Sequence, residues 1–444
     1  MSATTDTAQL KKNYLWNTLG SLANAFSSVC MLLACTRLIG VEAAGLFSLA
    51  FALAQQFQVL GHFEIRSYQA TDANERFSFA VYYGARIVTC TIMVLTIMAY
   101  TLITKGLTTE ACVVILVALL RIFDAFEDVF HGMFQQKGRL DIAGKAFFFR
   151  ICAMMLGFTL AAWLSRDLQV SCVVALIVGA VTCFVCNIIP ARRFVALVPS
   201  FRVRPIARLL LACLPLFCGS FMLVYITNAP KYAIDAYLTP QVQALYSYLF
   251  MPSLVINLLS GFVFKPLLTE MSTSFSNHNI RAFISIIVKG FAAVCVATVV
   301  TMIAAGLIGI QVLSTLSGID LAAYALELQV LLVGGLFNAL GIILYYAIVT
   351  MRHQRVIYGA YGISCIACYG ASALVERFGL MGAAVLYDIA MGLCAACFLL
   401  ACIYYLVDAS KRTPAHEHGD TMSAANVPGT ITSGDNAASK DYPA

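Results

Sequence analysis

Long apolar runs separated by short polar connections cover most of the chain. Twelve such runs span residues 14–36, 43–65, 79–104, 109–130, 143–164, 168–189, 208–229, 241–264, 282–305, 323–348, 356–375 and 382–406. A transmembrane α-helix needs roughly 20 consecutive, mostly apolar residues to cross the hydrocarbon core of a bilayer. The pattern therefore predicts an all-α polytopic membrane protein with about 12 transmembrane helices.

The connections between the runs predict how the chain is divided. A basic cytoplasmic linker, 190–207, separates an N-terminal lobe of six spans, 13–189, from a C-terminal lobe of six spans, 208–406. The polar residues 1–12 form a cytoplasmic N-terminus, and the small and polar residues 407–444 are predicted to form a disordered cytoplasmic tail. Because the first apolar run is too long for a signal peptide, we expect the first helix to be a membrane anchor.

A weak internal repeat relates the two halves. Residues 45–49, with the sequence GLFSL, resemble residues 244–248, with the sequence ALYSY, at an offset of 199 positions. Six spans per half place both halves in the same orientation, so the repeats are predicted to be parallel and related by an axis along the membrane normal. This arrangement places a central cavity between two lobes, which is typical of a transporter rather than of a membrane-bound enzyme.

Composition supports the membrane prediction. Apolar residues make up 61% of the chain and charged residues 11%, whereas soluble domains average about 45–50% and about 25%. These values exclude a soluble enzyme, a nucleic-acid-binding protein and a disordered chain. The 16 cysteines lie nearly all inside apolar runs, so we interpret them as small packing residues and predict no metal or redox site.

The distribution of basic residues predicts the orientation. With both termini inside, 18 of the 28 Lys and Arg residues lie on the cytoplasmic face and only 5 on the opposite face. Cytoplasmic loops carry an excess of Lys and Arg. The sequence therefore favours an N-in/C-in topology.

Ionisable side chains inside spans are costly and mark candidate functional sites. The fourth run ends with Arg121, Asp124, Glu127 and Asp128, of which the first two and the last share one helical face. A structural interpretation pairs Arg121 with Asp124, and a functional one brings Arg121 to a phosphate of the cargo. The carboxylates of Asp124, Glu127 and Asp128 are then candidates for hydrating the cavity, for bridging the lobes or for coupling.

Three further arginines of the first half add to this cluster. Arg86 and Arg150 each lie about 7 residues inside a run, and Arg66 lies at the end of the second run. Arg86 and Arg150 can extend to the cytoplasmic headgroups, or join Arg66 and Arg121 in a cationic mouth. Because guanidinium groups bind phosphate oxygens in a bidentate manner, this mouth is predicted to bind a diphosphate.

The second half contains fewer charged residues within its spans. Asp388 is a candidate site for a coupling cation or proton, or a hydrogen-bonded structural residue, and Lys289 is a second coupling candidate. Lys231 and Asp235, four residues apart near the outer face, can pair with each other. Uncharged polar residues can either bind hydroxyl groups of the cargo or connect helices: Asn17, Asn24, Gln55, Gln56, Gln58, Asn257 and Asn338.

Several stretches of the first half resemble a known family. Residues 37–40 (RLIG), 44–50 (AGLFSLA), 66–72 (RSYQATD), 123–135 (FDAFEDVFHGMFQ) and 138–141 (GRLD) resemble the opening of bacterial Wzx-type polysaccharide flippases. These flippases belong to the multidrug/oligosaccharidyl-lipid/polysaccharide exporter (MOP) superfamily, and the resemblance implies a MATE-like fold. The motifs cover roughly residues 13–150, and the number of spans extends the similarity to residue 406.

The resemblance implies a flippase in the bacterial cytoplasmic (inner) membrane. Its cargo would be an undecaprenyl-diphosphate-linked oligosaccharide for cell-surface polysaccharide biosynthesis, moved by alternating access. Arg66, Arg86, Arg121 and Arg150 would hold the diphosphate, and Asn17, Asn24, Gln55 and Asn257 would contact sugar. Partners would be membrane lipids, a polysaccharide polymerase and other assembly proteins, with no nucleic acid and no cofactor, and with coupling to H⁺, Na⁺ or the membrane potential.

Two other functions compete with this interpretation. A drug or cation antiporter of the same superfamily should have a carboxylate-rich cavity for cationic ligands. A membrane glycosyltransferase or polymerase would need a large loop with catalytic residues, and the longest connection, 190–207, contains no acidic residue. A chain without such a loop is not expected to be an enzyme.

Overall fold

Ten of the twelve apolar runs lie within one continuous helical segment of the computed structural model, which describes residues 2–72, 76–277 and 279–412. The runs 43–65 and 356–375 each cross a break between two helices. Of residues 2–8, 255, 257–269 and 409–412 only the backbone is described. The predicted tail, 407–444, therefore lies mostly outside the described residues.

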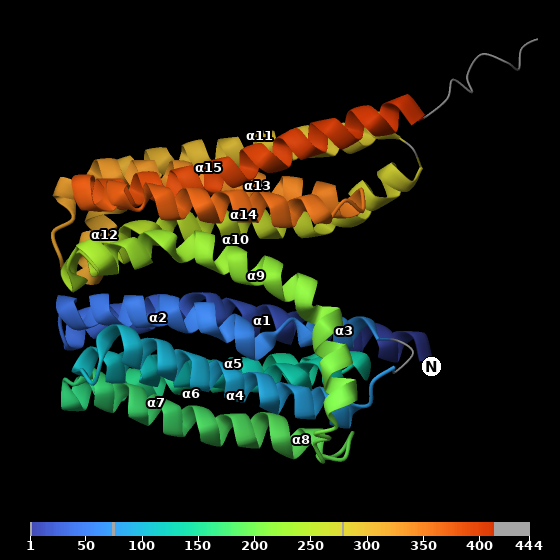
Figure 1. Ribbon diagram of the computed structural model, residues 1–444, viewed down its shortest axis with the longest axis horizontal. Helices are drawn as coiled ribbons and strands as arrows, with labels where there is room; N and C mark the ends of the chain where they lie inside the picture. Colours follow the sequence, from blue (N-terminus) through green and yellow to red (C-terminus); the bar gives the residue numbers. More distant parts are fainter. Residues whose placement is uncertain (1, 73–75, 278, 413–444) are drawn as a thin grey trace, which may run out of the picture.

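The first half of the chain forms seven helices and a short helical extension (Figure 1). They are α1 (Ser2–Leu38), α2 (Val41–His62), α3 (Ile65–Thr71), α4 (Phe79–Lys105), α5 (Thr109–Gln136), α6 (Leu140–Ser165) and α7 (Leu168–Cys183), which continues through a π-helical turn, η1 (Phe184–Ile188), into α8 (Ile189–Ala191). Side-chain caps begin two of them: Thr108 accepts a hydrogen bond from the backbone N–H of Ala111 at the start of α5, and Asp167 accepts one from Val170 at the start of α7.

The second half repeats this plan. It comprises α9 (Val203–Tyr237), α10 (Pro240–Ser276), α11 (Ile280–Ala304) with the π-helical turn η2 (Ala305–Gly309), α12 (Ile310–Ser317), the 3₁₀ turn η3 (Ala322–Tyr324), α13 (Ala325–Thr350), α14 (Arg355–Ala371) and α15 (Ala373–Arg412). Gly379 has a φ of 58° inside α15, so the long final helix changes direction there. Pro215 and Pro230 lie inside α9, which bends as it crosses from one half to the other (Figure 1).

Nine of the described helical segments are long and apolar enough to cross a membrane. Three more helices, α5, α10 and α14, coincide with predicted spans. In α5 the charged residues Arg121, Asp124, Glu127 and Asp128 reduce the hydropathy, and α14 has only 17 residues. The chain is thus an all-helical, multi-span membrane protein.

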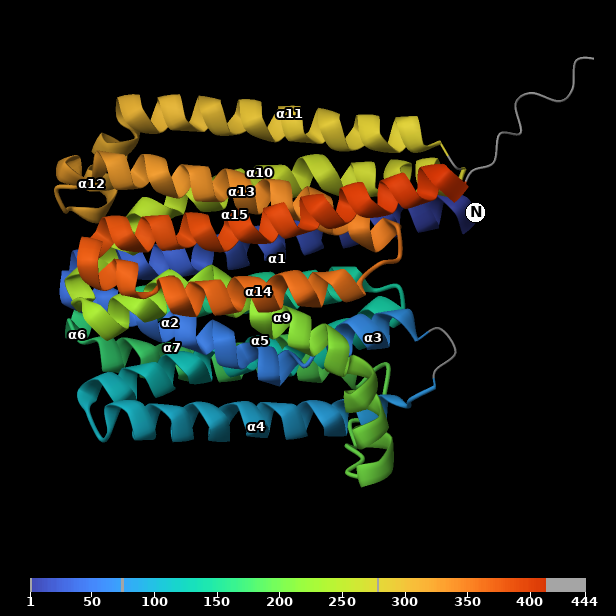
Figure 2. The same cartoon turned by 45° about the horizontal axis from the view of Figure 1, so that its top comes forward.

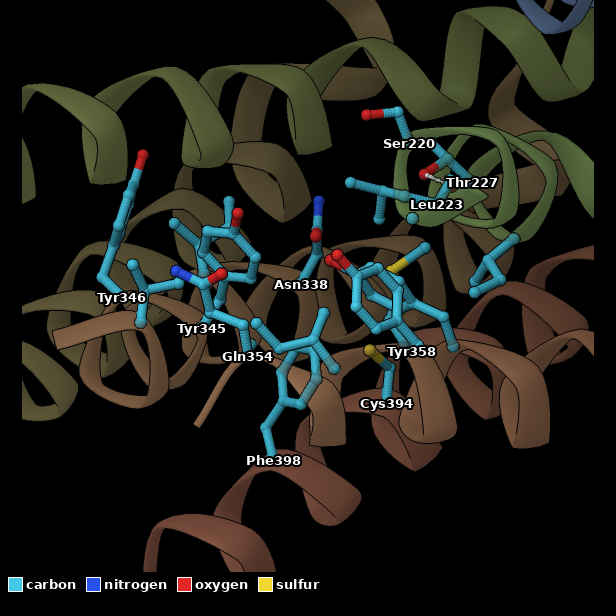
Figure 3. Close-up of a pocket in the computed structure, with 18 of the residues that line it drawn as sticks. Ser220, Leu223, Thr227, Asn338, Tyr345, Tyr346, Gln354, Tyr358, Cys394 and Phe398 are labelled. Atoms are coloured by element: carbon cyan, nitrogen blue, oxygen red, sulfur yellow. Dashed lines mark hydrogen bonds between the residues drawn. The ribbon is translucent and has the colours of Figure 1, made fainter. Parts of the chain in front are cut away.

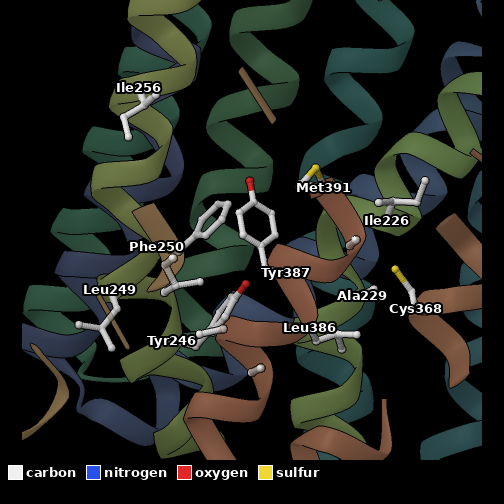
Figure 4. Close-up of a cluster of buried hydrophobic side chains, with 14 of the residues drawn as sticks. Ile226, Ala229, Tyr246, Leu249, Phe250, Ile256, Cys368, Leu386, Tyr387 and Met391 are labelled. Atoms are coloured by element: carbon white, nitrogen blue, oxygen red, sulfur yellow. The ribbon is translucent and has the colours of Figure 1, made fainter. Parts of the chain in front are cut away.

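The helices form two bundles that meet along α2, α9 and α10 (Figures 1 and 2). In the N-terminal bundle α1 packs on α6, and α2 and α4 pack on α5. In the C-terminal bundle α13 packs on α10, α11 and α15, and α14 packs on α9 and α15. A buried aromatic cluster that contains Tyr246, Phe250 and Tyr387 stabilises the contact between α10 and α15 (Figure 4).

The predicted repeat is visible where the bundles touch. Ser48 of α2 and Ser247 of α10 are 199 positions apart, are both buried, and form a hydrogen bond of 2.5 Å between their hydroxyl oxygens. Gly45, one turn earlier in α2, lies against the backbone of Pro240, where a Cβ atom would have no room. Equivalent residues meet in this way when two equivalent helices cross at the axis that relates two repeats.

Candidate functional site

Helix α5 places three carboxylates inside the N-terminal bundle. Arg150 of α6 binds two of them: its Nε lies 2.9 Å from Glu127 Oε2, and its Nη2 lies 2.6 Å from Glu127 Oε1 and also contacts Asp124 Oδ1. The side chains of Arg150 and Glu127 are each only 1% exposed. This bidentate pair is therefore buried inside the N-terminal bundle.

Asp128 binds the arginines of the neighbouring helices. Arg86 of α4 donates to Asp128 Oδ2 at 2.7 Å and to the carbonyl oxygens of Gly61 and His62 at 2.5 and 2.9 Å. Arg66 of α3 lies 3.3 Å from Asp128 Oδ1, and His62 Nδ1 lies 3.3 Å from Asp128 Oδ2. Because the side chain of Arg86 is 0% exposed, it does not reach the headgroup region or an open cavity.

These contacts change the interpretation of the four arginines. The predicted mouth treats them as one group that faces a diphosphate, whereas the structure places Arg86 and Arg150 in buried ion pairs. The free-energy cost of removing a charge from water is offset only when the charge is closely paired. The three α5 carboxylates provide these pairs for Arg86 and Arg150. Arg66 is partly exposed beside Asp128, and only Arg121 among the four lines a cavity between the bundles.

Sequence reasoning missed two partners of this network. Asn187, in the π-helical turn η1, donates to Glu127 Oε2 at 2.9 Å, and its Oδ1 lies 3.1 Å from His131 Nε2. Both residues are buried. A π-helical turn shifts side-chain directions by one residue, which 3.6-residue periodicity does not reveal. The signal available in the sequence was an asparagine three residues before Pro190, near the end of the apolar run 168–189.

A cavity of about 560 Å³ lies between the two bundles, and we call it the central cavity. It is lined by α1, α2, α5, α9 and α10, and it exposes two cations, Arg121 and Lys231. Neutral polar groups surround them: Asn24, Ser28, Ser48, Gln55, Thr227, Asn228 and Ser247. None of the described residues that line this cavity is an aspartate or glutamate.

The two cations of the central cavity are held differently. Arg121 donates to Asp124 Oδ2 at 2.5 Å, and its guanidinium carbon lies 4.3 Å from the centre of the Phe51 ring, but its Nε has no hydrogen-bond partner in the described structure. Lys231 has no hydrogen bond or ion pair to any described residue. Its predicted partner Asp235 instead accepts from Lys105 Nζ at 2.8 Å. The expected Lys231–Asp235 pair is therefore replaced by a contact between α4 and α9.

The remaining candidates are dispersed. Asn24 and Gln55 line the central cavity, whereas Asn17 is exposed on α1 and the side chain of Asn257 lies outside the described residues. Lys289 is exposed on α11. Asp388 lies on α15 beside Gly334 of α13, and its Oδ1 is buried without a hydrogen-bond partner among the described residues.

A second cavity, of about 590 Å³, lies in the C-terminal bundle between α9, α13, α14 and α15, and we call it the aromatic cavity (Figure 3). Its wall includes Asn338, Tyr345, Tyr346, Gln354, Tyr358 and Tyr361. Glu64, at the break between α2 and α3, closes the side that faces the N-terminal bundle. Thr227 of α9 lines both cavities, so the two spaces are neighbours.

Comparison with solved structures places this arrangement in a known architecture. A multidrug resistance MATE family transporter of the MOP superfamily in an inward-facing conformation is 12% identical, with a TM-score of 0.60, and the match covers 92% of this chain and 100% of that chain. This chain has the MATE-type fold. Neither a family model nor a curated protein matches the sequence.

Two further transporter structures have similar scores. VcmN of Vibrio cholerae in its bent form is 11% identical, with a TM-score of 0.57, and the match covers 92% of this chain and 99% of that chain. A MOP superfamily transporter from Pyrococcus furiosus, described by the reverse polarity of its binding pocket, is 12% identical, with a TM-score of 0.56 and coverage of 91% and 97%. The MATE-like fold expected from the sequence is thus confirmed.

Proposed function

We propose that this protein is a flippase that moves an undecaprenyl-diphosphate-linked oligosaccharide across the bacterial cytoplasmic membrane by alternating access. The observation that carries the proposal is the charge of the central cavity, where Arg121 and Lys231 face the space between the lobes and none of the described lining residues is a carboxylate. The resemblance of residues 37–141 to Wzx-type flippases suggests that this cargo is an oligosaccharide on a lipid carrier.

Electrostatics favours an anionic cargo over a cationic one. An ammonium group inside a bilayer is costly unless it is paired or hydrated, and Lys231 has no described protein partner. A diphosphate at this position would pair with Lys231 and with the free donors of Arg121. A drug or cation antiporter would instead need an unpaired carboxylate in this cavity, and Asp124, the nearest acid, is already bound by Arg121 and Arg150.

The contacts between the bundles support an inward-facing state in the proposed cycle. Arg37 of α1 donates to the carbonyl oxygens of Thr315 and Leu316, and Lys105 binds Asp235. These contacts join the lobes at the end that the distribution of basic residues predicts to be periplasmic. In the cycle we propose, they open when the cargo is released, with energy from H⁺, Na⁺ or the membrane potential, and Asp388 is the candidate coupling residue.

A matched pair of lysine variants tests the proposal. Lys231→Met removes the cation of the central cavity that has no described partner, and Lys12→Met makes the same change at an exposed position on α1. Because a hydrogen bond to a charged group contributes about 1.5–3 kcal/mol, the first variant should reduce transport roughly 10- to 100-fold. The second should transport at the wild-type rate. The readout is the amount of lipid-linked oligosaccharide that reaches the outer leaflet in the native host.

Depletion of the protein provides the wider test. The proposal requires lipid-linked precursors to accumulate in the inner leaflet when the protein is depleted, and to be cleared when wild-type protein is restored. Equal precursor levels in both leaflets during depletion would contradict the flippase function. Export of a cationic dye that needs Asp388 but not Lys231 would favour the antiporter instead.

A further inference from the structure

We infer that the aromatic cavity is a carbohydrate-binding site that receives the glycan of the cargo while the diphosphate lies at Arg121 and Lys231. This inference rests on the proposed flippase function and adds a separate location for the sugar. Of the polar residues predicted to bind hydroxyl groups of the cargo, Asn24 and Gln55 line the central cavity, whereas Asn338 lines the aromatic cavity.

Polar groups in the aromatic cavity are available to a ligand. The amides of Asn338 and Gln354 and the hydroxyls of Tyr345, Tyr346 and Tyr358 make no hydrogen bond to any other described residue. Figure 3 shows Asn338, Tyr345 and Tyr358 reaching into the same space below α9. Amides and phenols both donate and accept hydrogen bonds, which matches sugar hydroxyls, since each hydroxyl also does both.

The aromatic rings supply the apolar half of such a site. Tyr345 and Tyr346 pack edge to face with ring centres 5.4 Å apart, and Phe398 lies behind Tyr345 and Tyr361 at 6.5 and 5.6 Å. Rings held in this way present flat apolar faces beside polar edges. A pyranose ring has the complementary pattern, with C–H faces and hydroxyl edges. A volume of about 590 Å³ lies within the roughly 300–1,000 Å³ of small-molecule sites.

Charge separates this cavity from the central one. Glu64 is the one charged side chain among the described residues that line it, and both of its carboxylate oxygens accept hydrogen bonds, at 2.7 Å from Ser67 and 2.7 Å from Ser220. A phosphate would meet no cation here and would be repelled by Glu64. A neutral ligand rich in hydroxyl groups needs no cation and is not repelled by Glu64.

Gly219 of α9 leaves space for the ring of Tyr358. A Cβ atom on Gly219 would lie 3.0 Å from Tyr358 Cε1, so any larger residue at 219 displaces the ring. Gly341 of α13 also lines the cavity. A Cβ atom on Gly341 would lie 3.9 Å from its nearest neighbour, the Cβ atom of Ala395. A leucine at 341 can therefore be accommodated at its Cβ and fills the cavity without removing a polar group.

Photo-crosslinking in the native host tests the site without knowledge of the glycan. We would replace Tyr345, Tyr358 or Phe51 with p-benzoylphenylalanine, and use Tyr369, which is 79% exposed on α14, as the control. After irradiation, periodate oxidation and hydrazide labelling detect any attached sugar with vicinal hydroxyls. We expect labelled adducts at 345 and 358 and none at 369.

The outcomes separate the two proposals. Adducts at Phe51 in the central cavity but not at 345 or 358 would overturn the aromatic-cavity inference and leave the flippase function intact. No adduct at any cavity position, in cells that contain lipid-linked precursors, would contradict the flippase function itself.

Transport by cavity variants provides a second measurement. Asn338→Leu and Tyr358→Phe each remove hydrogen-bonding capacity and should each reduce transport roughly 10-fold, and Gly341→Leu should block it at normal protein levels. Tyr369→Phe is the matched control and should be neutral. Wild-type transport in Asn338→Leu, Tyr358→Phe and Gly341→Leu would overturn the inference.

Discussion

Arg150 and Lys231 are both cations inside the helical bundles, but their surroundings give them different roles. Arg150 is buried with Glu127 and Asp124, and its guanidinium group is paired with both carboxylates. Lys231 lines the central cavity and has no such partner. At the scale of single residues, pairing therefore distinguishes a stabilising charge from the charge that we propose to bind the cargo.

Loss of the buried pair should lower stability. Arg150→Met leaves Glu127 buried without its described ion-pair partner, while Asp124 keeps Arg121, and breaking a buried pair in this way typically costs about 3–5 kcal/mol. We expect a large fall in the thermal unfolding temperature of the purified protein, partly reversed in Arg150→Met/Glu127→Leu. Lys231→Met should unfold at the wild-type temperature, so a comparable fall there would contradict the assigned difference.

A second residue-scale prediction concerns pH. Asp72 follows α3, outside the spans, where burial raises the pKa of its carboxyl. Hydrogen bonds from the Arg76 N–H, the Tyr82 hydroxyl and the Phe77 N–H, at 3.0, 2.8 and 3.2 Å, outweigh that effect and hold the pKa below its usual 3.8. The unfolded chain then binds the proton more readily, so the carboxylate stabilises the fold at neutral pH.

The test compares wild type with Asp72→Asn across the acid range. The difference in unfolding temperature should be constant from pH 8 to about pH 5 and should shrink as the pH falls below about 4, where the carboxyl of the unfolded chain takes up its proton. A difference that grows on acidification would contradict the direction of the pKa shift.

At the scale of helices, α2 and α10 determine how the lobes meet. Ser48 and Ser247 touch where these helices cross, and Thr36 of α1 contacts the Tyr248 hydroxyl beside them. The proposed alternating-access cycle requires this end of the molecule to separate. We therefore expect transport to require that α2 and α10 move apart where they cross.

A disulfide across the crossing should stop the cycle. In a background without native cysteines, Ser48→Cys/Ser247→Cys places two thiols where the hydroxyl oxygens lie 2.5 Å apart, close enough for a bridge. Oxidation should abolish transport, and reduction should restore it. The single variants serve as controls, and unchanged transport by the cross-linked protein would contradict separation of the lobes at this end.

At the scale of the whole molecule, the direction of transport depends on the N-in/C-in topology, which rests on the distribution of basic residues. Leu107, between α4 and α5, is 96% exposed and is predicted to be periplasmic, whereas Val203, at the start of α9, is 79% exposed and is predicted to be cytoplasmic.

Cysteine accessibility tests this topology. A membrane-impermeant maleimide should label Leu107→Cys in intact cells, and should label Val203→Cys only after the membrane is opened. Both variants should be made in a background without the exposed Cys30, Cys112 and Cys295. The reverse labelling pattern would contradict the topology and would invert the proposed direction of transport.

The amino-acid sequence by itself determined the helices, because crossing a bilayer requires long apolar runs that are visible without knowledge of any partner. It also indicated the repeat that Ser48 and Ser247 share. Arg121, Asn24 and Gln55, which it predicted as cargo contacts, line the central cavity. These features depend on local hydropathy and periodicity, which the order of residues contains directly.

Only the tertiary structure decided which charges are available. Arg86, Arg150 and Asp128 come from three different helices, and their pairing follows from how α4, α5 and α6 pack rather than from spacing along the chain. The same packing leaves Lys231 without a described partner, because Asp235 forms an ion pair with Lys105 instead. It also places the tyrosines of α13 and α14 around one cavity. Charge pairing and cavity shape depend on distances between distant segments, so they became visible only when the helices were in place.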